Sequence, residues 1–143
     1  MPAPGVKARI DRFWRAARRL KAISSVGEAR FASDENLVDA GERNLQVAIE
    51  AVIDVGEALV AYMGWRTPRS YRDVGAILFE NGVISGALYE QFKRAVNIRN
   101  ILVHNYAYIM PKDLYVTIKD LIGALTEIMS SIISYMAERG IDP

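Results

Sequence analysis

The sequence predicts an all-α protein, an antiparallel bundle of about five helices. Over long stretches apolar residues recur every three or four positions, which is the period of an amphipathic helix. No stretch alternates apolar and polar residues as a half-buried strand does. Short segments with Gly or Pro separate the long stretches, so consecutive helices are expected to turn back on one another.

The chain is expected to form a single domain over residues 1–143. A length of 143 residues is that of one domain, and 51% of the residues are hydrophobic, which is enough to form a core. We expect residues 1–32 to form a basic first helix and a loop, and residues 33–139 to form the core bundle.

The first two helices are predicted from apolar periodicity and capping residues. The first runs over residues 6–24, and a loop with Gly27 and a possible short turn follows it. Ser33 or Asp34 has the side chain to cap a long second helix that reaches about Met63. In both helices the apolar residues fall on one face, which predicts that this face is buried.

A short third helix is predicted between Ser70 and the Asn81-Gly82 pair. Residues 64–68 contain Gly and Pro and interrupt the second helix. Ser70 can cap the third helix, with Asp73 three residues later as the other half of a capping box. Asn81-Gly82 is suited to the left-handed conformation that ends a helix.

Two more helices complete the predicted bundle. Ser85 opens the fourth, which is expected to end near His104. Pro111 suits the first turn of the fifth, and Gly140 ends it. Residues 114–132 of the fifth helix carry a wide apolar stripe, so we expect this helix to be buried in the bundle.

The composition excludes several kinds of site. The chain has no cysteine and one histidine, so disulfides, thiolate metal sites and multi-histidine metal sites within one subunit are excluded. The sequence contains no phosphate-cradling glycine loop, nucleophile elbow or dinucleotide fingerprint. We therefore expect no cofactor and no ATP-dependent or redox chemistry.

The sequence predicts a cytoplasmic protein without a membrane segment. Its N-terminus lacks the apolar core of a signal peptide. The most apolar run, residues 121–137, contains Glu127 and three serines and is shorter than the ~20 residues that a membrane span needs. The absence of cysteine fits a reducing compartment.

Positive charge is concentrated in the first helix. The whole chain has a formal net charge of +1, but residues 1–25 contain seven Lys or Arg and one acid, Asp11. A basic helix on an acidic body can contact nucleic acid. It can equally be a solvated helix face, and the sequence leaves both readings open.

Residues 99–106, which read RNILVHNY, hold the strongest chemical signal in the chain. Arg99 offers a permanently charged guanidinium that can clamp a phosphate with two hydrogen bonds. His104, the single histidine, carries an imidazole that can give or take a proton near neutral pH. Together they supply what metal-free cleavage of an RNA phosphodiester requires: one group to move a proton and one to offset growing negative charge.

The spacing of the motif raises a question of geometry. In a continuous helix, residues five apart point about 140° away from each other, whereas residues four apart share a face. Asn100 and His104 therefore share a face, and Arg99 does not. Arg99 can bend toward the imidazole, the helix can end at His104, or a second subunit can bring its own Arg and His to the same cleft.

The pattern R-x4-H-x-Y resembles the signature of the HEPN superfamily, and the tyrosine after the histidine is similar to the HepT-like branch. Asn100 and the apolar pair before His104 fit this family. So do the segments AIEAVIDVG at residues 48–56 and PRSYRD at residues 68–73. The resemblance covers roughly residues 34–136.

The resemblance implies a function and a mode of assembly. HEPN proteins form dimers in which paired motifs line one interfacial groove. We therefore expect a toxin-type endoribonuclease in which Arg99 and His104 cut RNA without a metal and leave a 2′,3′-cyclic phosphate and a 5′-hydroxyl. In the HepT-like branch a partner nucleotidyltransferase antitoxin attaches AMP to the tyrosine that corresponds to Tyr106. The added anion would repel a phosphate substrate.

Two carboxylates and one amide are candidates for supporting roles. Glu50 and Asp54 lie four residues apart on the second predicted helix, within apolar sequence. Either they face solvent, or one of them points into the groove and pairs with Arg99 or orients His104. Asn100 is a surface residue by itself, but beside His104 it is a candidate to orient the imidazole or to contact phosphate.

Two other functions compete with a toxin ribonuclease. A non-catalytic helical module would bind a nucleotidyltransferase partner or a nucleotide through the same cleft. A plain structural homodimer would bury Arg99 and His104 in unrelated ion pairs. The joint presence of Arg, Asn and His favours the ribonuclease, because a pure binding module has no need for all three.

Overall fold

The computed structural model describes residues 4–104 and 109–143, and these residues form six helices and no strand. The all-α prediction is therefore confirmed. In chain order the helices are α1 (Lys7–Ile23), α2 (Glu28–Ser33), α3 (Glu35–Met63), α4 (Tyr71–Glu80), α5 (Gly86–His104) and α6 (Pro111–Glu138). None of the described helices is long and apolar enough to cross a membrane.

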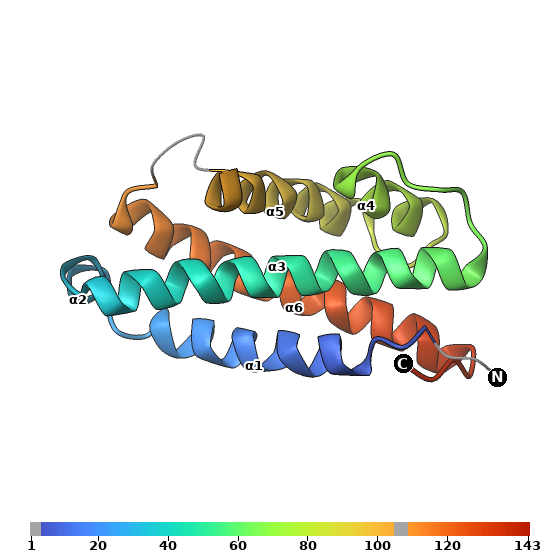
Figure 1. Ribbon diagram of the computed structural model, residues 1–143, viewed down its shortest axis with the longest axis horizontal. Coiled ribbons are helices and arrows are strands. Elements are labelled where there is room, and N and C mark those ends of the chain that lie inside the picture. The colour runs from blue at the N-terminus through green and yellow to red at the C-terminus, as the bar shows by residue number, and fades with distance from the viewer. Residues whose placement is uncertain (1–3, 105–108) are drawn as a thin grey trace.

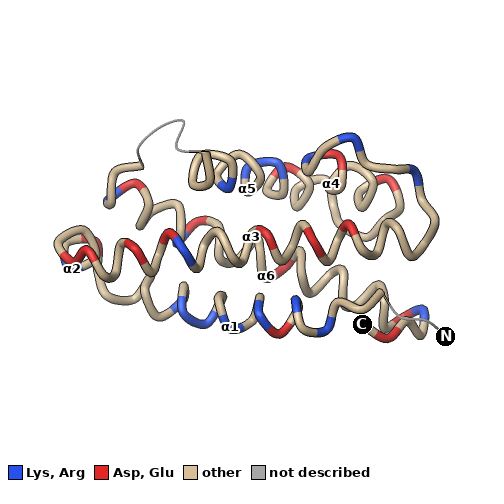
Figure 2. Tube along the Cα trace, in the orientation of Figure 1, with Lys and Arg blue, Asp and Glu red and all other residues tan. Residues whose placement is uncertain are grey.

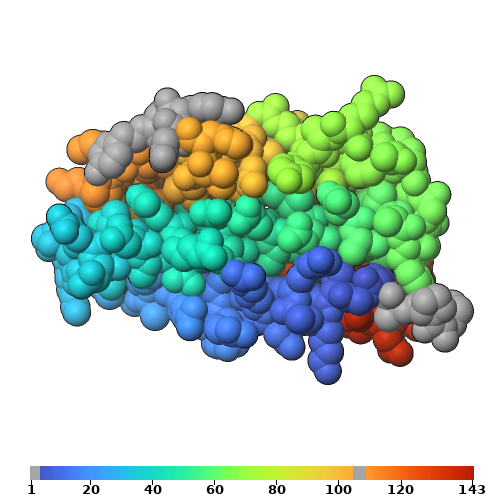
Figure 3. All heavy atoms as spheres, viewed as in Figure 1, coloured from blue at the N-terminus to red at the C-terminus, as the bar shows by residue number. Residues whose placement is uncertain are grey.

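Four long helices lie side by side along the longest axis of the molecule (Figure 1). Helix α3 runs antiparallel to α1 and α5 and in the same direction as α6, while the short helices α2 and α4 sit at opposite ends. The segment before α1 meets the end of the chain, where the Val6 amide donates to the Pro143 carbonyl at 3.3 Å. In Figure 3, α3 forms a central strip of one face between α1 and the α4–α5 pair.

The core is continuous and apolar. Every described residue that is fully buried and carries a large side chain is hydrophobic, and no buried residue is polar or charged. The predicted apolar faces are confirmed: Leu45, Val52 and Leu59 of α3 and Ile118 and Leu125 of α6 are all at most 2% exposed. Burial of this stripe, rather than helix propensity alone, holds the long helices in place.

The described residues contain one helix more than the five outlined from the sequence, because the possible short turn after Gly27 folds as α2. This helix has only six residues, too few to be stable alone. Tertiary contacts hold it: Phe31 is fully buried, and its ring lies 5.3 Å from the ring of Tyr115. The Tyr115 hydroxyl accepts from the Gly27 amide at 3.1 Å and donates to the Ser24 carbonyl at 2.6 Å.

Capping residues set the helix boundaries largely as predicted. Asp34, not Ser33, caps α3, since its carboxylate accepts from the amides of Asn36 and Leu37. Ser70 caps α4 by accepting from the Asp73 amide at 3.1 Å. The reciprocal half of the predicted capping box differs, because the Asp73 carboxylate accepts from the Arg69 amide instead of the Ser70 amide.

A cluster of three charged residues fastens the loop before α4 to that helix. Arg66 donates two hydrogen bonds to Asp73, at 2.7 and 2.9 Å, and two to Glu80, at 3.1 and 2.6 Å. The bonds from Arg66 to Asp73, with the one from the Arg69 amide, lower the pKa of Asp73 from 3.8 to about 2. The carboxylate form of Asp73 is therefore favoured in the folded protein.

We expect Asp73→Asn to lower the free energy of unfolding at pH 7 by about 1 kcal/mol, because solvent around Arg66 screens most of the interaction. A depressed carboxyl pKa stabilises the fold above the ordinary pKa of Asp, and this contribution disappears as pH falls through the folded value. The difference between wild type and variant should therefore close between about pH 4 and pH 2. Urea unfolding of both proteins across this pH range measures the difference, with Asp11→Asn at an exposed position as the control. A difference that stays constant with pH would contradict the ion-pair account.

Close contact between α4 and α5 fixes the position of the motif helix. Gly75 of α4 is buried, and a Cβ at this position would lie 2.5 Å from Cδ1 of Phe92 on α5. Only glycine lets the ring approach the backbone this closely. The fully buried Phe92 ring therefore sets the distance between α4 and the helix that carries residues 99–104.

Candidate functional site

Arg99 lies at the centre of a polar network between α3 and α5. Its Nε and Nη2 donate to Oε2 of Glu50 at 3.2 and 3.1 Å, and its Nη1 donates to Oδ1 of Asn100 at 3.2 Å. The other Glu50 oxygen accepts from Gln46 at 3.2 Å. The Tyr71 ring lies 5.2 Å from the guanidinium carbon, within the range of a cation–π contact.

This network orients the guanidinium of Arg99, whose side chain is only 15% exposed. An arginine side chain has many rotamers and loses considerable entropy when it is fixed. Glu50, itself 33% exposed, fixes one edge of the planar group, and Tyr71 adjoins it. Arg99 is therefore held in one orientation before any ligand arrives.

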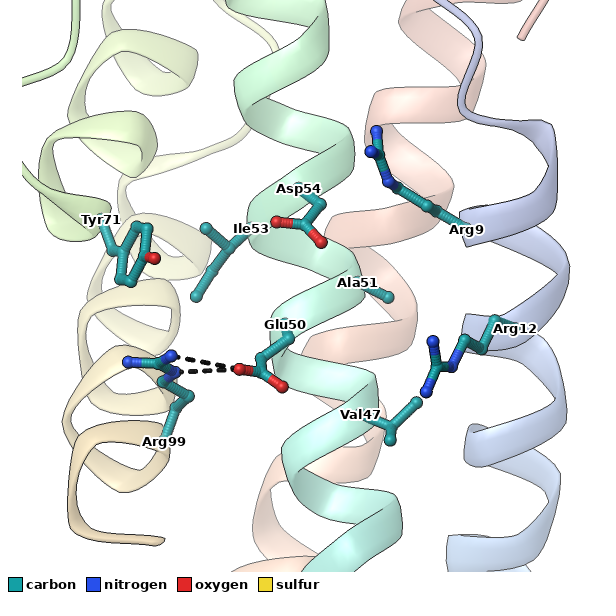
Figure 4. A pocket seen from close by; sticks show the side chains of 9 residues that line it. All are labelled: Arg9, Arg12, Val47, Glu50, Ala51, Ile53, Asp54, Tyr71 and Arg99. Carbon is teal, nitrogen blue, oxygen red and sulfur yellow. Dashed lines mark hydrogen bonds and ion pairs between the residues drawn. The ribbon is translucent and has the colours of Figure 1, made fainter. Parts of the chain in front are cut away.

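A pocket of about 250 Å³ opens beside Arg99. Figure 4 shows Glu50 and Asp54 on α3 in the middle of the pocket, Arg99 and Tyr71 on one side, and Arg9 and Arg12 of α1 on the other. Three apolar residues of α3 complete the lining: Val47, Ala51 and Ile53. Three arginines against two carboxylates leave the lining with a formal excess of one positive charge.

The charge of the pocket depends on Asp54. Asp54 is an exposed residue. The pocket walls nevertheless remove part of the hydration of its carboxyl, and this desolvation raises the pKa of the carboxyl. The positive charges of Arg9 and Arg99 act in the opposite direction, and the negative charge of Glu50 raises the pKa further. Protonation of Asp54 would make the pocket more positive.

Four of the predicted residues are brought together by the structure. Of the two carboxylates, Glu50 is the one that pairs with Arg99, and Asp54 lines the same pocket without a direct hydrogen bond to it. Asn100 bonds Arg99 instead of being a plain surface residue. The reading in which Glu50 only faces solvent was therefore wrong.

His104 is not brought into this pocket within one chain. It is the exposed last residue of α5, and the described residues that line the pocket do not include it. Five positions along a helix are about 7.5 Å and about 140° of rotation, so Arg99 and His104 stand on different faces of α5. Tyr106, the predicted modification site, lies outside the described residues.

The sequence pointed only indirectly to Arg9, Arg12 and Tyr71 as pocket residues. The charge excess in residues 1–25 was the signal for the two arginines, but spacing alone does not say which edge of α1 meets α3. Tyr71 is 42% exposed and joins the pocket from the first residue of α4.

No metal centre was predicted. Among residues 4–104 and 109–143, no three His, Cys, Asp or Glu side chains lie close enough together to hold a metal ion.

Comparison with known proteins places this architecture among toxins and ribonucleases. A family model described as ribonuclease HepT-like matches residues 14–132. The mRNA nuclease HepT of Shewanella oneidensis is 33% identical over 92 residues, which are 64% of this chain and 68% of that protein.

Two solved structures share the fold. One is a tri-AMPylated Shewanella oneidensis HEPN toxin in complex with MNT antitoxin; it has a TM-score of 0.83 at 24% identity, and the match covers 94% of this chain and 99% of that one. The other is a mutant of the toxin–antitoxin MntA-HpeT. It has a TM-score of 0.80 at 25% identity, and the match covers 90% of this chain and 97% of that one.

Proposed function

Because this chain belongs to the HepT-like ribonuclease family, we propose that it is the toxin of a toxin–antitoxin pair and that it cuts RNA through Arg99 and His104. The observation that carries the proposal is the fixed guanidinium of Arg99 beside an open, positively charged pocket. A phosphodiester is the ligand that such a group binds best.

Arg99 retains the capacity to bind phosphate while it is paired with Glu50. A guanidinium has five N–H donors, and three of them are used by Glu50 and Asn100 among the described residues. Two donors remain for a phosphate oxygen pair, which is the number that a bidentate contact needs. Glu50 thus acts as a positioning residue and does not block the site.

His104 supplies the proton transfer in this proposal. A base removes the proton from the ribose 2′-hydroxyl, whose oxygen attacks phosphorus. The bond from phosphorus to the 5′-oxygen breaks, and an acid protonates that oxygen. The products are a 2′,3′-cyclic phosphate and a 5′-hydroxyl, and no metal enters the step.

A homodimer completes the site. Within one protomer Arg99 and His104 point to different faces of α5, so a second protomer that packs against this end of the helix would bring another Arg and His to one groove. One histidine then serves as base and the other as acid, which is what a two-proton mechanism requires. The dimer places the active site at the interface.

The cognate partner is a small nucleotidyltransferase antitoxin. The Shewanella toxin of the same fold is AMPylated and bound to an MNT antitoxin. By analogy, Tyr106, two residues after His104, is the residue that the partner modifies with AMP. The added phosphate places negative charge next to the groove and repels RNA.

The test is cleavage of a defined RNA in EDTA by protein purified free of the antitoxin, after mass spectrometry has confirmed that Tyr106 is unmodified. We expect fragments that end in 2′,3′-cyclic phosphate and begin with 5′-hydroxyl. An inert unmodified protein on several RNAs would reject the nuclease and favour the non-catalytic module that binds a nucleotidyltransferase. Cleavage that EDTA abolishes would reject the metal-free mechanism alone.

A further inference from the structure

The cations of α1 are unpaired, although an acidic helix lies beside them. Among the described residues, none of the seven Lys and Arg of α1 forms an ion pair or a side-chain hydrogen bond, and all seven are exposed. Of the eleven cations elsewhere, five form ion pairs: Arg66, Lys93, Arg94, Arg99 and Arg139. Figure 2 shows the contrast between the basic α1 and the acidic positions of α3.

This arrangement does not serve the stability of the fold. Like charges three or four positions apart on a helix repel each other, and α1 contains several such pairs, for example Arg12 with Arg15 and Arg15 with Arg19. Ion pairs with the carboxylates of α3 would relieve this repulsion. Arg9 acts on Asp54 only through its electric field, which lowers the pKa of the Asp54 carboxyl. A row of cations left in water is available to an external polyanion.

Two of these cations belong to the candidate site. Arg9 and Arg12 line the same pocket as Arg99, on the opposite side of α3 (Figure 4). They precede residue 14, where the match to the family model begins. By contrast, Arg18 and Lys21 line a separate groove between α1 and α6, so the basic face of α1 has two distinct edges.

We propose that Arg9 and Arg12 form a second phosphate-binding site, which holds the backbone of single-stranded RNA after it leaves Arg99 and crosses α3. The inference rests on the proposed ribonuclease function and extends it to the path of the substrate. The strand passes over Glu50 and Asp54, which lie on α3 between Arg99 and the two arginines of α1 (Figure 4). Its phosphates are held on both sides of these carboxylates by arginines.

The pocket suits a single strand of RNA better than an acidic protein surface. The Tyr71 ring is exposed beside Arg99, and an exposed aromatic ring next to a cationic track is a platform on which a base can stack. A base stacked on Tyr71 and phosphates bound by the arginines would match the alternation of bases and phosphates along a nucleotide chain. An acidic peptide would use the arginines but would leave the exposed part of the Tyr71 ring uncovered.

The test compares two double variants that each remove two positive charges from α1. Binding of a labelled single-stranded RNA is measured against salt concentration in the His104→Ala background, so that the RNA stays intact. The variants are Arg9→Gln with Arg12→Gln, at the α3 edge, and Arg18→Gln with Lys21→Gln, at the α6 edge. Glutamine keeps helix propensity, and circular dichroism checks the fold.

We expect the Arg9/Arg12 variant to reduce the slope of log K against log salt by about 1.4, since each phosphate contact to a single strand contributes about 0.7. The loss of affinity between about 50 and 200 mM salt should then shrink by about sevenfold. The Arg18/Lys21 variant should change the slope by less than half as much.

An equal loss in both variants would overturn the proposal, because it would mean that α1 acts only through its overall charge. Unchanged RNA binding with weaker binding of the nucleotidyltransferase partner would also overturn it and make this edge a protein interface. Either result leaves RNA cleavage by the wild-type protein intact. Failure of the ribonuclease function itself would instead appear as a wild-type protein that cuts no RNA, together with the absence of RNA binding in every variant.

Discussion

His104→Ala is expected to lower the rate constant of RNA cleavage by about 10²- to 10⁴-fold, the usual contribution of a positioned general acid or base. Arg99→Ala should lower it by about 10²- to 10³-fold, because the developing charge on phosphate loses its fixed donors. Arg99→Lys should remain impaired, since an ammonium keeps the charge but cannot offer the planar pair of donors. Single-turnover cleavage of a defined RNA by mass-verified protein measures each rate.

Arg94→Ala is the matched control for these variants. Arg94 lies on the same helix and pairs at the surface with Asp120 at 3.5 Å, so its loss removes the same charge away from the pocket. We expect this variant to cut RNA at close to the wild-type rate. The catalytic assignment fails if Arg94→Ala is as slow as Arg99→Ala, or if His104→Ala keeps full activity.

The exposed position of His104 argues against a folding defect as the cause of lost activity. The residue ends α5 and is not part of the core. Arg99 is more embedded, and its removal leaves Glu50 without its ion-pair partner. The double variant Arg99→Ala with Glu50→Gln separates the two effects, because it removes the unpaired carboxylate without restoring a phosphate clamp.

Phe92→Ala is expected to lower the free energy of unfolding by about 3–5 kcal/mol, the range for removal of a fully buried aromatic ring. This is a large share of the roughly 5–15 kcal/mol that holds a domain of this size together. The ring fills the space above Gly75, where no side chain of α4 can replace it. The variant should therefore also loosen α5 and the residues that it positions.

Phe79→Ala provides the control with the same chemical change at an exposed site. Phe79 is 46% exposed and stacks on Tyr89 at a distance of 5.6 Å between ring centroids. Its removal should cost about 1 kcal/mol or less. Urea unfolding of both variants gives the comparison; similar losses at Phe79 and Phe92 would contradict the view that the Gly75 contact holds α4 and α5 together.

Local chemistry in the sequence determined most of the fold. Periodicity placed the long helices, and Asp34, Ser70 and Pro111 marked where α3, α4 and α6 begin. These signals are readable because a cap or a helix face involves residues only a few positions apart. The short helix α2 was missed for the same reason: its stability comes from Phe31 and Tyr115, which are 84 positions apart.

The motif with Arg99 and His104 was likewise visible in the sequence, and it led to the family that the comparisons confirm. The identity of the reactive groups is a property of residue type and spacing. The way in which these groups come together in space does not follow from residue type and spacing. The pairing of Arg99 with Glu50 joins residues 49 positions apart, and nothing local distinguishes Glu50 from Asp54, which lies one helical turn away.

Only the tertiary structure decided which side chains share the pocket. The rotation of α1 against α3 places Arg9 and Arg12 at one edge and Arg18 and Lys21 at the other. That rotation is set by how the buried residues of the two helices interlock, which periodicity does not specify. The sequence thus determined the helices and the reactive residues, while packing between distant helices determined which charges face one another.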